Sequence, residues 1–201
     1  MKIVLVRHGE TPGNREKRYV GTTDESLTEE GRRALEECRA PEADRIYASP
    51  RRRCLETAAI LYPGRPVTVV PGLAECLFGA FEYKNYRDLT GNPDYQRWID
   101  SGGTIGFPGG ESREAFQQRC LEAFRWVLQD ARQAESRSAA LVVHGGTIMA
   151  LMSALSVPPS SYYDWQLGNG CWVEAEEQDG RLYARAFQEN LHARWRGHHQ
   201  P

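Results

Sequence analysis

The chain begins with a short β-branched apolar run that ends abruptly in charge. Residues 2–6 read Lys-Ile-Val-Leu-Val, and Arg7, His8 and Gly9 follow at once. So apolar a run is typical of a buried strand in a parallel sheet. Open α/β sheets place their ligands at the carboxyl ends of such strands. We therefore expect His8 to lie at the mouth of a site, where Gly9 lets the backbone approach closely.

Two distant segments repeat this pattern of an apolar run that ends in polar side chains. The run 141–143 leads into His144 and Gly145, and the run 45–48 is soon followed by three arginines at 51–53. Because the carboxyl ends of parallel strands meet at one edge of the sheet, we expect these residues to converge on the first histidine.

The residue types that would converge suit a phosphoryl group. An arginine guanidinium offers a planar fork of donors that matches phosphate oxygens. An imidazole can attack phosphorus and form a covalent intermediate. Of the three consecutive arginines only one can face inward at the start of a helix, and the other two are expected to be solvated.

Strand-like runs alternate with helical patterns along the chain. The strand-like runs lie near 2–7, 44–48, 67–70, 139–144, 171–176 and 182–187. Helices are expected from a start at 26–31 to about Cys38, from Pro50 in a first turn to about Leu61, and across 112–134, beginning at Ser112. The alternation predicts an α/β fold, a three-layer α/β/α sandwich with a mostly parallel central sheet. A length of 201 residues suits one domain spanning 1–201.

The stretch 76–111 breaks this rhythm. It holds an unusual set of aromatic residues among glycines, prolines and charges: Phe78, Phe81, Tyr83, Tyr86, Tyr95, Trp98 and Phe107. We interpret it as an inserted lid packed over the carboxyl edge of the sheet. A helical hairpin with its own small core fits the pattern equally well.

Composition narrows the classes of partner and compartment. A formal net charge of −2 gives no reason to expect nucleic acid or an anionic membrane as a partner. The five cysteines are scattered and form no CxxC, which favours reduced thiols over a disulfide framework or a zinc site. No signal peptide or membrane span is apparent, so a cytoplasmic protein is expected. The polar tail from His192 to Pro201 predicts a frayed terminus, and the oligomeric state stays open, with a homodimer as one alternative.

Several short motifs occur in a fixed order along the chain: Arg7–Thr11, Asn14, Asp24–Gly31, Ser49-Pro50 with Arg53 and Thr57, Glu75 before Phe78-Gly79, Gly110–Ser112, and His144–Gly146. They resemble the histidine phosphatase superfamily, the clan of the cofactor-dependent phosphoglycerate mutases and related phosphatases. The compact length and the last two motifs are most similar to the α-ribazole phosphatase branch of cobalamin synthesis. Glu56 and Tyr83 depart from the family pattern near the expected substrate face, which leaves the substrate open.

The resemblance implies a role for each matched residue. His8 would be the nucleophile, with one ring nitrogen held by a backbone carbonyl. The other expected site residues are His144 and Glu75 as catalytic groups, and Arg7, Asn14, Arg53 and the amide of Gly145 as substrate ligands. Glu75 would act as general acid and then general base, which requires a raised carboxyl pKa.

Neighbouring acidic and polar residues carry weaker expectations. Glu10 and Thr11 are expected to fix the loop after the first strand. Glu82 and Glu111 could equally face substrate or solvent. No metal or other cofactor is expected, because no acidic triad or thiolate accompanies the two histidines at ligand spacing.

The resulting hypothesis is a phosphomonoesterase that hydrolyses a small-molecule phosphate through a phosphohistidine intermediate, with α-ribazole 5'-phosphate as a candidate substrate. One alternative is a phosphoglycerate mutase-like isomerase, in which a second substrate hydroxyl replaces water as the acceptor. An alternative of another class is a non-catalytic domain that binds a phosphate ligand. Glu75 argues against the last, since a binding domain needs no acid/base carboxylate.

Overall fold

The apolar runs that end in histidine form two neighbouring strands at the centre of one sheet. In the computed structural model, which describes residues 1–187, the strands are β1 (Lys2–Arg7), β2 (Arg45–Ala48), β3 (Val67–Val69), β4 (Ser138–Val143), β5 (Trp172–Gln178) and β6 (Arg181–Phe187). Their order in the sheet is β3-β2-β4-β1-β5-β6. The pairs β1–β4, β2–β4 and β2–β3 are parallel, whereas β5 is antiparallel to both of its neighbours. The mostly parallel sheet is thereby confirmed.

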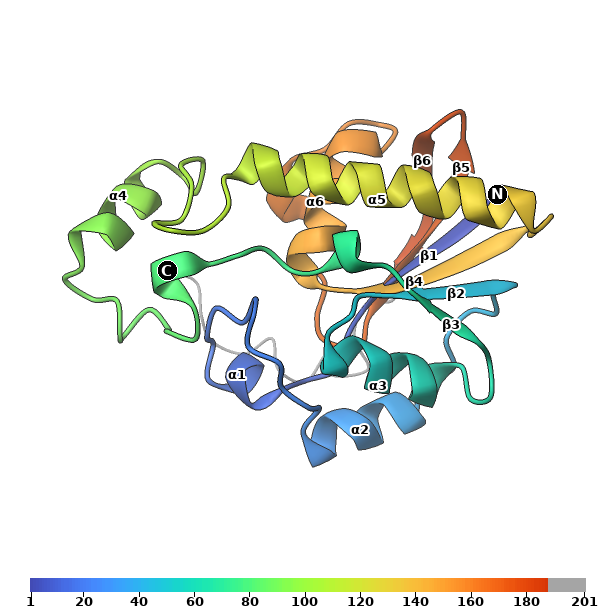
Figure 1. Ribbon diagram of the computed structural model, residues 1–201, viewed down its shortest axis with the longest axis horizontal. Helices are drawn as coiled ribbons and strands as arrows, with labels where there is room; N and C mark the ends of the chain where they lie inside the picture. The colour runs from blue at the N-terminus through green and yellow to red at the C-terminus, as the bar shows by residue number, and fades with distance from the viewer. Residues whose placement is uncertain (188–201) are drawn as a thin grey trace.

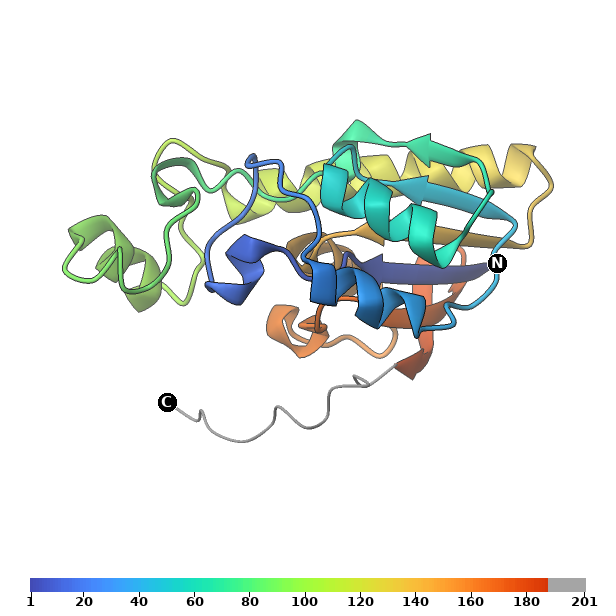
Figure 2. The same cartoon turned by 90° about the horizontal axis from the view of Figure 1, so that it is seen from below.

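Helices cover both faces of the sheet (Figures 1 and 2). They are α1 (Pro12–Arg15), α2 (Glu29–Glu36), α3 (Arg52–Leu61), α4 (Pro93–Asp100), α5 (Arg113–Gln133) and α6 (Gly145–Leu155), with short 3-10 turns η1 (Pro71–Leu73), η2 (Gly79–Phe81) and η3 (Tyr162–Trp165). The long helix α5 and α6 lie on one face, and α2 and α3 lie on the other (Figure 1). The predicted three-layer sandwich is therefore confirmed.

The side-chain alternation of β1 explains why both faces must be covered. Ile3 and Leu5 pack into the core beneath α5 and α6, whereas Val4 and Val6 pack into the core beneath α3. All four side chains are fully buried. A strand that is apolar on both faces is stable only between two layers.

Register brings the functional ends of three strands together. Arg7 of β1 pairs with Val143 of β4, and the backbone N–H of His8 donates to the Val143 carbonyl at 3.0 Å. On the other side of β4, the N–H of Ser49 donates to the Val142 carbonyl at 3.0 Å. The residues that follow β1, β4 and β2 therefore lie side by side at the carboxyl edge.

The expected helix starts are confirmed at two of three places. Thr28 caps α2, and Ser112 caps α5, each through its side-chain oxygen. Pro50 does not lie in the first turn of α3, because that helix has Arg51 as its N-cap and begins at Arg52. The proline instead fixes the turn that leads from β2 into the helix.

The segment 76–111, the expected lid, lies beyond the carboxyl edge of the sheet, and its role as a lid stays a prediction. It contains η2 and the single α-helix α4, which lies on the side toward which β1 points (Figures 1 and 2). Its aromatic rings pack against one another and against Tyr19, with Phe78 and Phe107 centroids 5.0 Å apart and Trp98 stacked on Phe107 at 5.4 Å. An aromatic cluster thus packs together a segment whose regular secondary structure is limited to η2 and α4.

Other expectations from composition can be compared with the described residues. All five cysteines lie within residues 1–187, and no disulfide joins any two of them. Within residues 1–187, no helix is long and apolar enough to cross a membrane. The expectation of a frayed tail at 192–201 lies outside the described residues.

Candidate active site

A cavity of about 320 Å³ opens where the carboxyl edge of the sheet meets the lid. Its polar lining includes Arg7, His8, Asn14, Glu75, Gly145 and Gly146. A second group, here called the aromatic wall, consists of Tyr19, Phe78, Trp98, Phe107, Tyr162 and Tyr163. Residues that are far apart in the sequence therefore form one pocket with polar and aromatic surfaces.

His8 presents a neutral imidazole with a defined tautomer. The ring is 4% exposed, and its Nδ1 lies 2.7 Å from the carbonyl oxygen of Gly9. Because a carbonyl can only accept, Nδ1 carries the hydrogen and Nε2 keeps its lone pair. Burial, followed by the charges of Arg53 and Arg7, lowers the pKa of His8 well below its usual value. The predicted carbonyl partner is confirmed, and the ring stays unprotonated near neutral pH.

Arg7 ends β1 with a donor that no described protein group accepts. One terminal nitrogen donates to the carbonyl of Leu167, while Nε is buried without a hydrogen-bond partner among residues 1–187. An unsatisfied buried donor is costly, and such groups are found at functional sites. The guanidinium packs against Gly145, where an added Cβ would lie 3.4 Å from it.

Arg53 lies behind the cavity and is fully enclosed. Its terminal nitrogens donate to the carbonyls of Thr23 at 2.8 Å and Val20 at 3.0 Å. Its Nε donates to His144 Nδ1 at 3.3 Å. The guanidinium therefore connects the loop at 20–23 to the second histidine, and it places a buried positive charge next to His8.

The helix register predicted for the three arginines is confirmed for its inward member, because Arg53 points into the protein. Arg52 is exposed, as expected. Arg51 is half-buried with an enclosed Nε, so the expectation that it is solvated is wrong. Arg51 is the N-cap residue of α3, so helical periodicity does not determine the direction of its side chain.

His144 is fully buried next to His8, with the two ring centroids 5.2 Å apart in an edge-to-face arrangement. Its Nε2 lies 2.7 Å from the hydroxyl of Ser49, and its Nδ1 accepts from Arg53. Burial and the charge of Arg53 lower the pKa of His144 well below its usual value. The structure thus brings this ring beside the nucleophile, with both nitrogens held by protein groups.

Glu75 supplies a carboxyl group with a raised pKa. It is 8% exposed and lines the cavity. Burial raises the pKa, against the opposing effect of two backbone amides and of Arg53 and Arg7. Those amides belong to Cys76, 2.9 Å from one carboxyl oxygen, and to Gly146, 3.2 Å from the other. A carboxyl group that is protonated more readily than usual can donate a proton to a leaving group.

The amino end of α6 also faces the cavity. This 11-residue helix begins at Gly145, directly after His144 as N-cap. The first amides of a helix have no partner within it and attract anions. Gly146 donates to Glu75, and Gly145, which also lines the cavity, has an amide that can donate to a phosphate oxygen.

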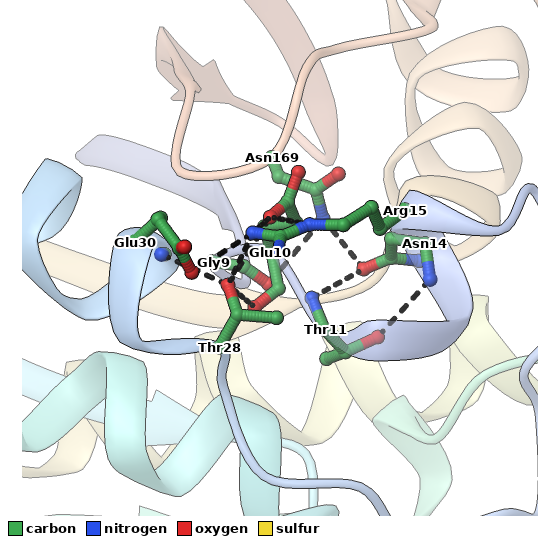
Figure 3. Close-up of polar contacts among 9 residues, drawn as sticks. Gly9, Glu10, Thr11, Asn14, Arg15, Thr28, Glu30 and Asn169 are labelled. Carbon is green, nitrogen blue, oxygen red and sulfur yellow. Dashed lines mark hydrogen bonds and ion pairs between the residues drawn. The ribbon is translucent and has the colours of Figure 1, made fainter.

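Asn14 is oriented by two donors. Its Oδ1 accepts from the backbone N–H of Thr11 at 3.2 Å and from Nδ2 of Asn169 at 2.9 Å (Figure 3). Because the oxygen is occupied in this way, the amide nitrogen is the group that Asn14 can offer to a ligand. Thr11 caps α1 and Glu10 pairs with Arg15, so both fix the loop as expected.

Two acidic residues that could have faced substrate are structural instead. Glu82 accepts from the backbone N–H groups of Gly21 and Thr23. Glu111 forms an ion pair with Arg119 at 2.8 Å. Neither residue lines the cavity. Instead of facing substrate or solvent, each stabilises the local structure through these contacts.

The two departures from the family pattern also lie away from the cavity. Glu56 pairs with Arg32 and accepts from the backbone of Leu27 at 2.9 Å. The hydroxyl of Tyr83 donates to Glu25 at 2.8 Å. The expectation that these two residues lie at the substrate face is therefore wrong, because each is turned toward a neighbouring loop.

Several residues of the site carry no recognisable sequence signal. Tyr19, Tyr162 and Arg113 line the cavity, and the guanidinium of Arg113 lies 3.9 Å above the Tyr162 ring. Asn169 lies in a Gly-Asn-Gly turn, a pattern that predicts only a turn. Within residues 1–187, no group of three or more His, Cys, Asp or Glu side chains is arranged to hold a metal ion. The metal-free mechanism stays a prediction.

Comparison with known proteins agrees with this geometry. The model of the histidine phosphatase superfamily (branch 1) matches residues 3–190. The chain belongs to this superfamily. It is 29% identical to the adenosylcobalamin/α-ribazole phosphatase of Salmonella typhimurium strain LT2, over 98% of this chain and 99% of that protein.

Solved structures give the same result. The α-ribazole phosphatase of Shigella flexneri superimposes with a TM-score of 0.80 at 25% identity, covering 94% of this chain and 96% of that one. The phosphoglycerate mutase of Thermus thermophilus superimposes with a TM-score of 0.72 at 31% identity, covering 93% and 98%. The predicted family, fold and phosphatase class are thus confirmed.

Replacement of Gly146 should disturb Glu75 selectively. A Cβ at Gly146 would lie 2.3 Å from the Glu75 carboxyl, whereas a Cβ at Gly145 would meet nothing closer than 3.4 Å. We expect Gly146→Ala to lower kcat by about 10²-fold or more, the usual worth of a displaced acid/base group. Gly145→Ala should cost much less. Equal phosphatase rates for the two variants, both folded by circular dichroism, would contradict this arrangement.

Proposed function

We propose that the chain hydrolyses a small-molecule phosphomonoester through a phosphohistidine formed on His8. The observation that carries this proposal is the unprotonated Nε2 of His8, in a cavity lined also by Arg7 and by the raised-pKa carboxyl of Glu75. A nucleophile, an anion-binding group and a proton donor are the minimum set for phosphoryl transfer to a side chain.

The first step transfers the phosphoryl group to the protein. The Nε2 lone pair forms a bond to phosphorus while the bond from phosphorus to the ester oxygen breaks. Glu75 gives its proton to that oxygen, so the product leaves as a neutral alcohol and Glu75 becomes a carboxylate. The hydrogen stays bonded to Nδ1 throughout and is donated to the Gly9 carbonyl, and this hydrogen bond stabilises the positively charged ring that forms.

The second step returns the protein to its starting state. The Glu75 carboxylate takes a proton from water as the water oxygen bonds to phosphorus and the nitrogen–phosphorus bond breaks. Inorganic phosphate leaves, His8 regains its lone pair, and Glu75 is again a protonated acid. Water is the acceptor of the phosphoryl group in this step, whereas in mutase chemistry a second substrate hydroxyl takes its place.

Charge on the transferring group would be balanced by donors around His8. The phosphoryl oxygens carry the spread negative charge of a loose transition state. Arg7 has a buried Nε without a hydrogen-bond partner among residues 1–187, and the amide of Gly145 and the Nδ2 of Asn14 add neutral donors. Arg53 and His144 lie in the layer behind, where Arg53 contributes a buried positive charge and His144 packs against the nucleophile.

The variant Glu75→Gln should separate the two steps. It keeps the shape of the side chain and removes proton transfer, which is worth roughly 10²–10⁴-fold. The alkoxide that leaves from an alkyl phosphate is a strong base, so cleavage of this ester should be lost already in the first turnover. The nitrophenolate that leaves from nitrophenyl phosphate is a much weaker base and needs little protonation. We therefore expect a stoichiometric burst of nitrophenol followed by slow turnover.

Rapid-quench measurements with both esters test this expectation. Glu114→Gln, an exposed acid in the first turn of α5, is the control and should behave as wild type. An equal loss of alkyl and aryl ester cleavage in the first turnover of Glu75→Gln would show that Glu75 is structural.

The aromatic wall supports a leaving group that carries a planar ring. Trp98 is stacked on both Tyr95 and Phe107, and it lines the same cavity as the nucleophile. Aromatic pairs gain about 0.5–1.5 kcal/mol beyond their burial. Together with the phosphatases of Salmonella and Shigella, this supports α-ribazole 5'-phosphate or a similar ring-bearing ester as substrate. A cytoplasmic location and the absence of nucleic-acid and membrane partners stay predictions, as does a homodimer.

A phosphomonoester panel tests the substrate class. Trp98→Ala should raise the KM for α-ribazole 5'-phosphate by roughly two- to tenfold, the loss of one aromatic contact, and should change little for 3-phosphoglycerate. Trp126→Ala, an exposed tryptophan on α5, is the matched control. A preference of the wild type for 3-phosphoglycerate, with phosphate transferred to a second hydroxyl instead of released, would favour the mutase alternative suggested by the Thermus relative.

A further inference from the structure

Asn169 contacts the nucleophile from a segment that is distant in sequence. It lies between η3 and β5, and β5 is the antiparallel neighbour of β1. Its side-chain nitrogen, Nδ2, lies 2.9 Å from Asn14 Oδ1, 3.2 Å from the His8 carbonyl and 3.4 Å from the Gly9 carbonyl. Figure 3 shows the Asn169 side chain at the edge of this group of polar contacts, with its nitrogen directed toward Asn14.

The chemistry of these contacts is specific to an amide nitrogen. Nδ2 carries two hydrogens and faces only oxygen acceptors. One hydrogen can go to Asn14, and the other can be shared by the two carbonyls of His8 and Gly9. The Gly9 carbonyl is the same group that accepts from His8 Nδ1 at 2.7 Å. One side chain therefore holds both the partner that fixes the His8 tautomer and the residue that offers a donor to phosphate.

The turn that carries Asn169 does not need this side chain to stay in place. The backbone N–H of Gly170 lies 3.1 Å from the carbonyls of both Arg7 and His8. The N–H of Arg7 donates to the Cys171 carbonyl at 2.9 Å. Backbone bonds thus dock the turn on the end of β1. The contacts of the Asn169 amide are added to this docking and are directed at the site.

We propose that Asn169 is a positioning residue that holds the His8–Gly9 peptide and the Asn14 carboxamide in the orientation needed for phosphoryl transfer. Loss of its Nδ2 frees the Gly9 carbonyl to rotate, and the Nδ1 hydrogen then loses a fixed acceptor. It also removes one of the two donors that orient Asn14, so the Asn14 carboxamide is held only by the backbone N–H of Thr11. This inference rests on the proposed role of His8 as nucleophile.

Steady-state and burst kinetics give the first test. Asn169→Ala should lower kcat by about 10²-fold, the cost of misplacing a reacting group, and should lower the rate of phosphoenzyme formation to the same extent. Asn85→Ala is the matched control, because its amide also donates to a backbone carbonyl, that of Glu16 at 3.2 Å, but outside the cavity. It should keep wild-type rates.

Coupling to Asn14 provides the second test. Asn14→Ala should lower kcat/KM, and the double variant with Asn169→Ala should lose less than the product of the two single effects, because part of the Asn169 effect passes through Asn14. Asn169→Asp keeps the shape of the side chain but replaces the donor by an oxygen. It should therefore be at least as impaired as Asn169→Ala, and wild-type activity in Asn169→Asp would overturn the proposal.

A spectroscopic measurement separates this proposal from the proposed function. In a ¹H–¹⁵N two-bond correlation spectrum of the wild-type ring nitrogens, His8 should show a protonated Nδ1 and an unprotonated Nε2. Asn169→Ala should show a mixture of tautomers, with its melting temperature close to that of wild type. An unchanged His8 tautomer together with kcat within twofold of wild type would overturn the role of Asn169. Failure of the wild type to form any phosphohistidine would instead overturn the proposed function, while the tautomer spectra still decide whether Asn169 fixes the ring.

Discussion

The hydrogen bond from His8 Nδ1 to the Gly9 carbonyl is the interaction on which the site depends. At 2.7 Å it fixes the hydrogen on the inner nitrogen and leaves the lone pair on the outer one. An imidazole without such a partner would divide its population between two tautomers and could rotate its ring. Three neighbouring elements position this bond. His8 follows directly after β1, Gly9 supplies the carbonyl, and Asn169 in the turn before β5 also donates to that carbonyl.

Burial gives the two reacting groups the protonation states that they need. It lowers the pKa of His8, because the charged imidazolium is poorly solvated there, and it raises the pKa of Glu75, because the charged carboxylate is poorly solvated. The two shifts have opposite directions and one cause. Burial therefore favours a neutral nucleophile beside a carboxyl group that is protonated more readily than usual, the pairing that ester cleavage requires.

Arg53 and Arg7 lower the pKa of both His8 and Glu75. Arg53 and Arg7 disfavour the imidazolium, which keeps His8 neutral, but they also favour the Glu75 carboxylate and so oppose the effect of burial. Arg53 directs its hydrogen bonds to backbone carbonyls and to His144, and Arg7 keeps one buried donor without a described partner. A phosphate bound at this place would supply the missing acceptor and the missing negative charge.

The sequence predicts the parts of this site that follow from local periodicity. Apolar runs ending in His8 and His144 identify neighbouring strand ends. Helical periodicity lets only one of the three arginines face inward, and the family resemblance indicates that it is Arg53. The sequence does not predict contacts that depend on how loops fold back. Asn169 reaches His8 only because β5 pairs antiparallel with β1 across 161 positions of sequence. For the same reason the sequence does not show that Glu56 and Tyr83 lie away from the cavity, where Glu56 pairs with Arg32 of α2 and Tyr83 donates to Glu25.

The central claim is that His8 carries the phosphoryl group during turnover. Rapid quenching of wild-type protein with ³²P-labelled substrate should trap a phosphoprotein that is labile in acid and stable in base, and peptide mapping should place the label on His8. His8→Ala should take up no label and lose turnover. Label found on another residue, or turnover retained by His8→Ala, would contradict the account.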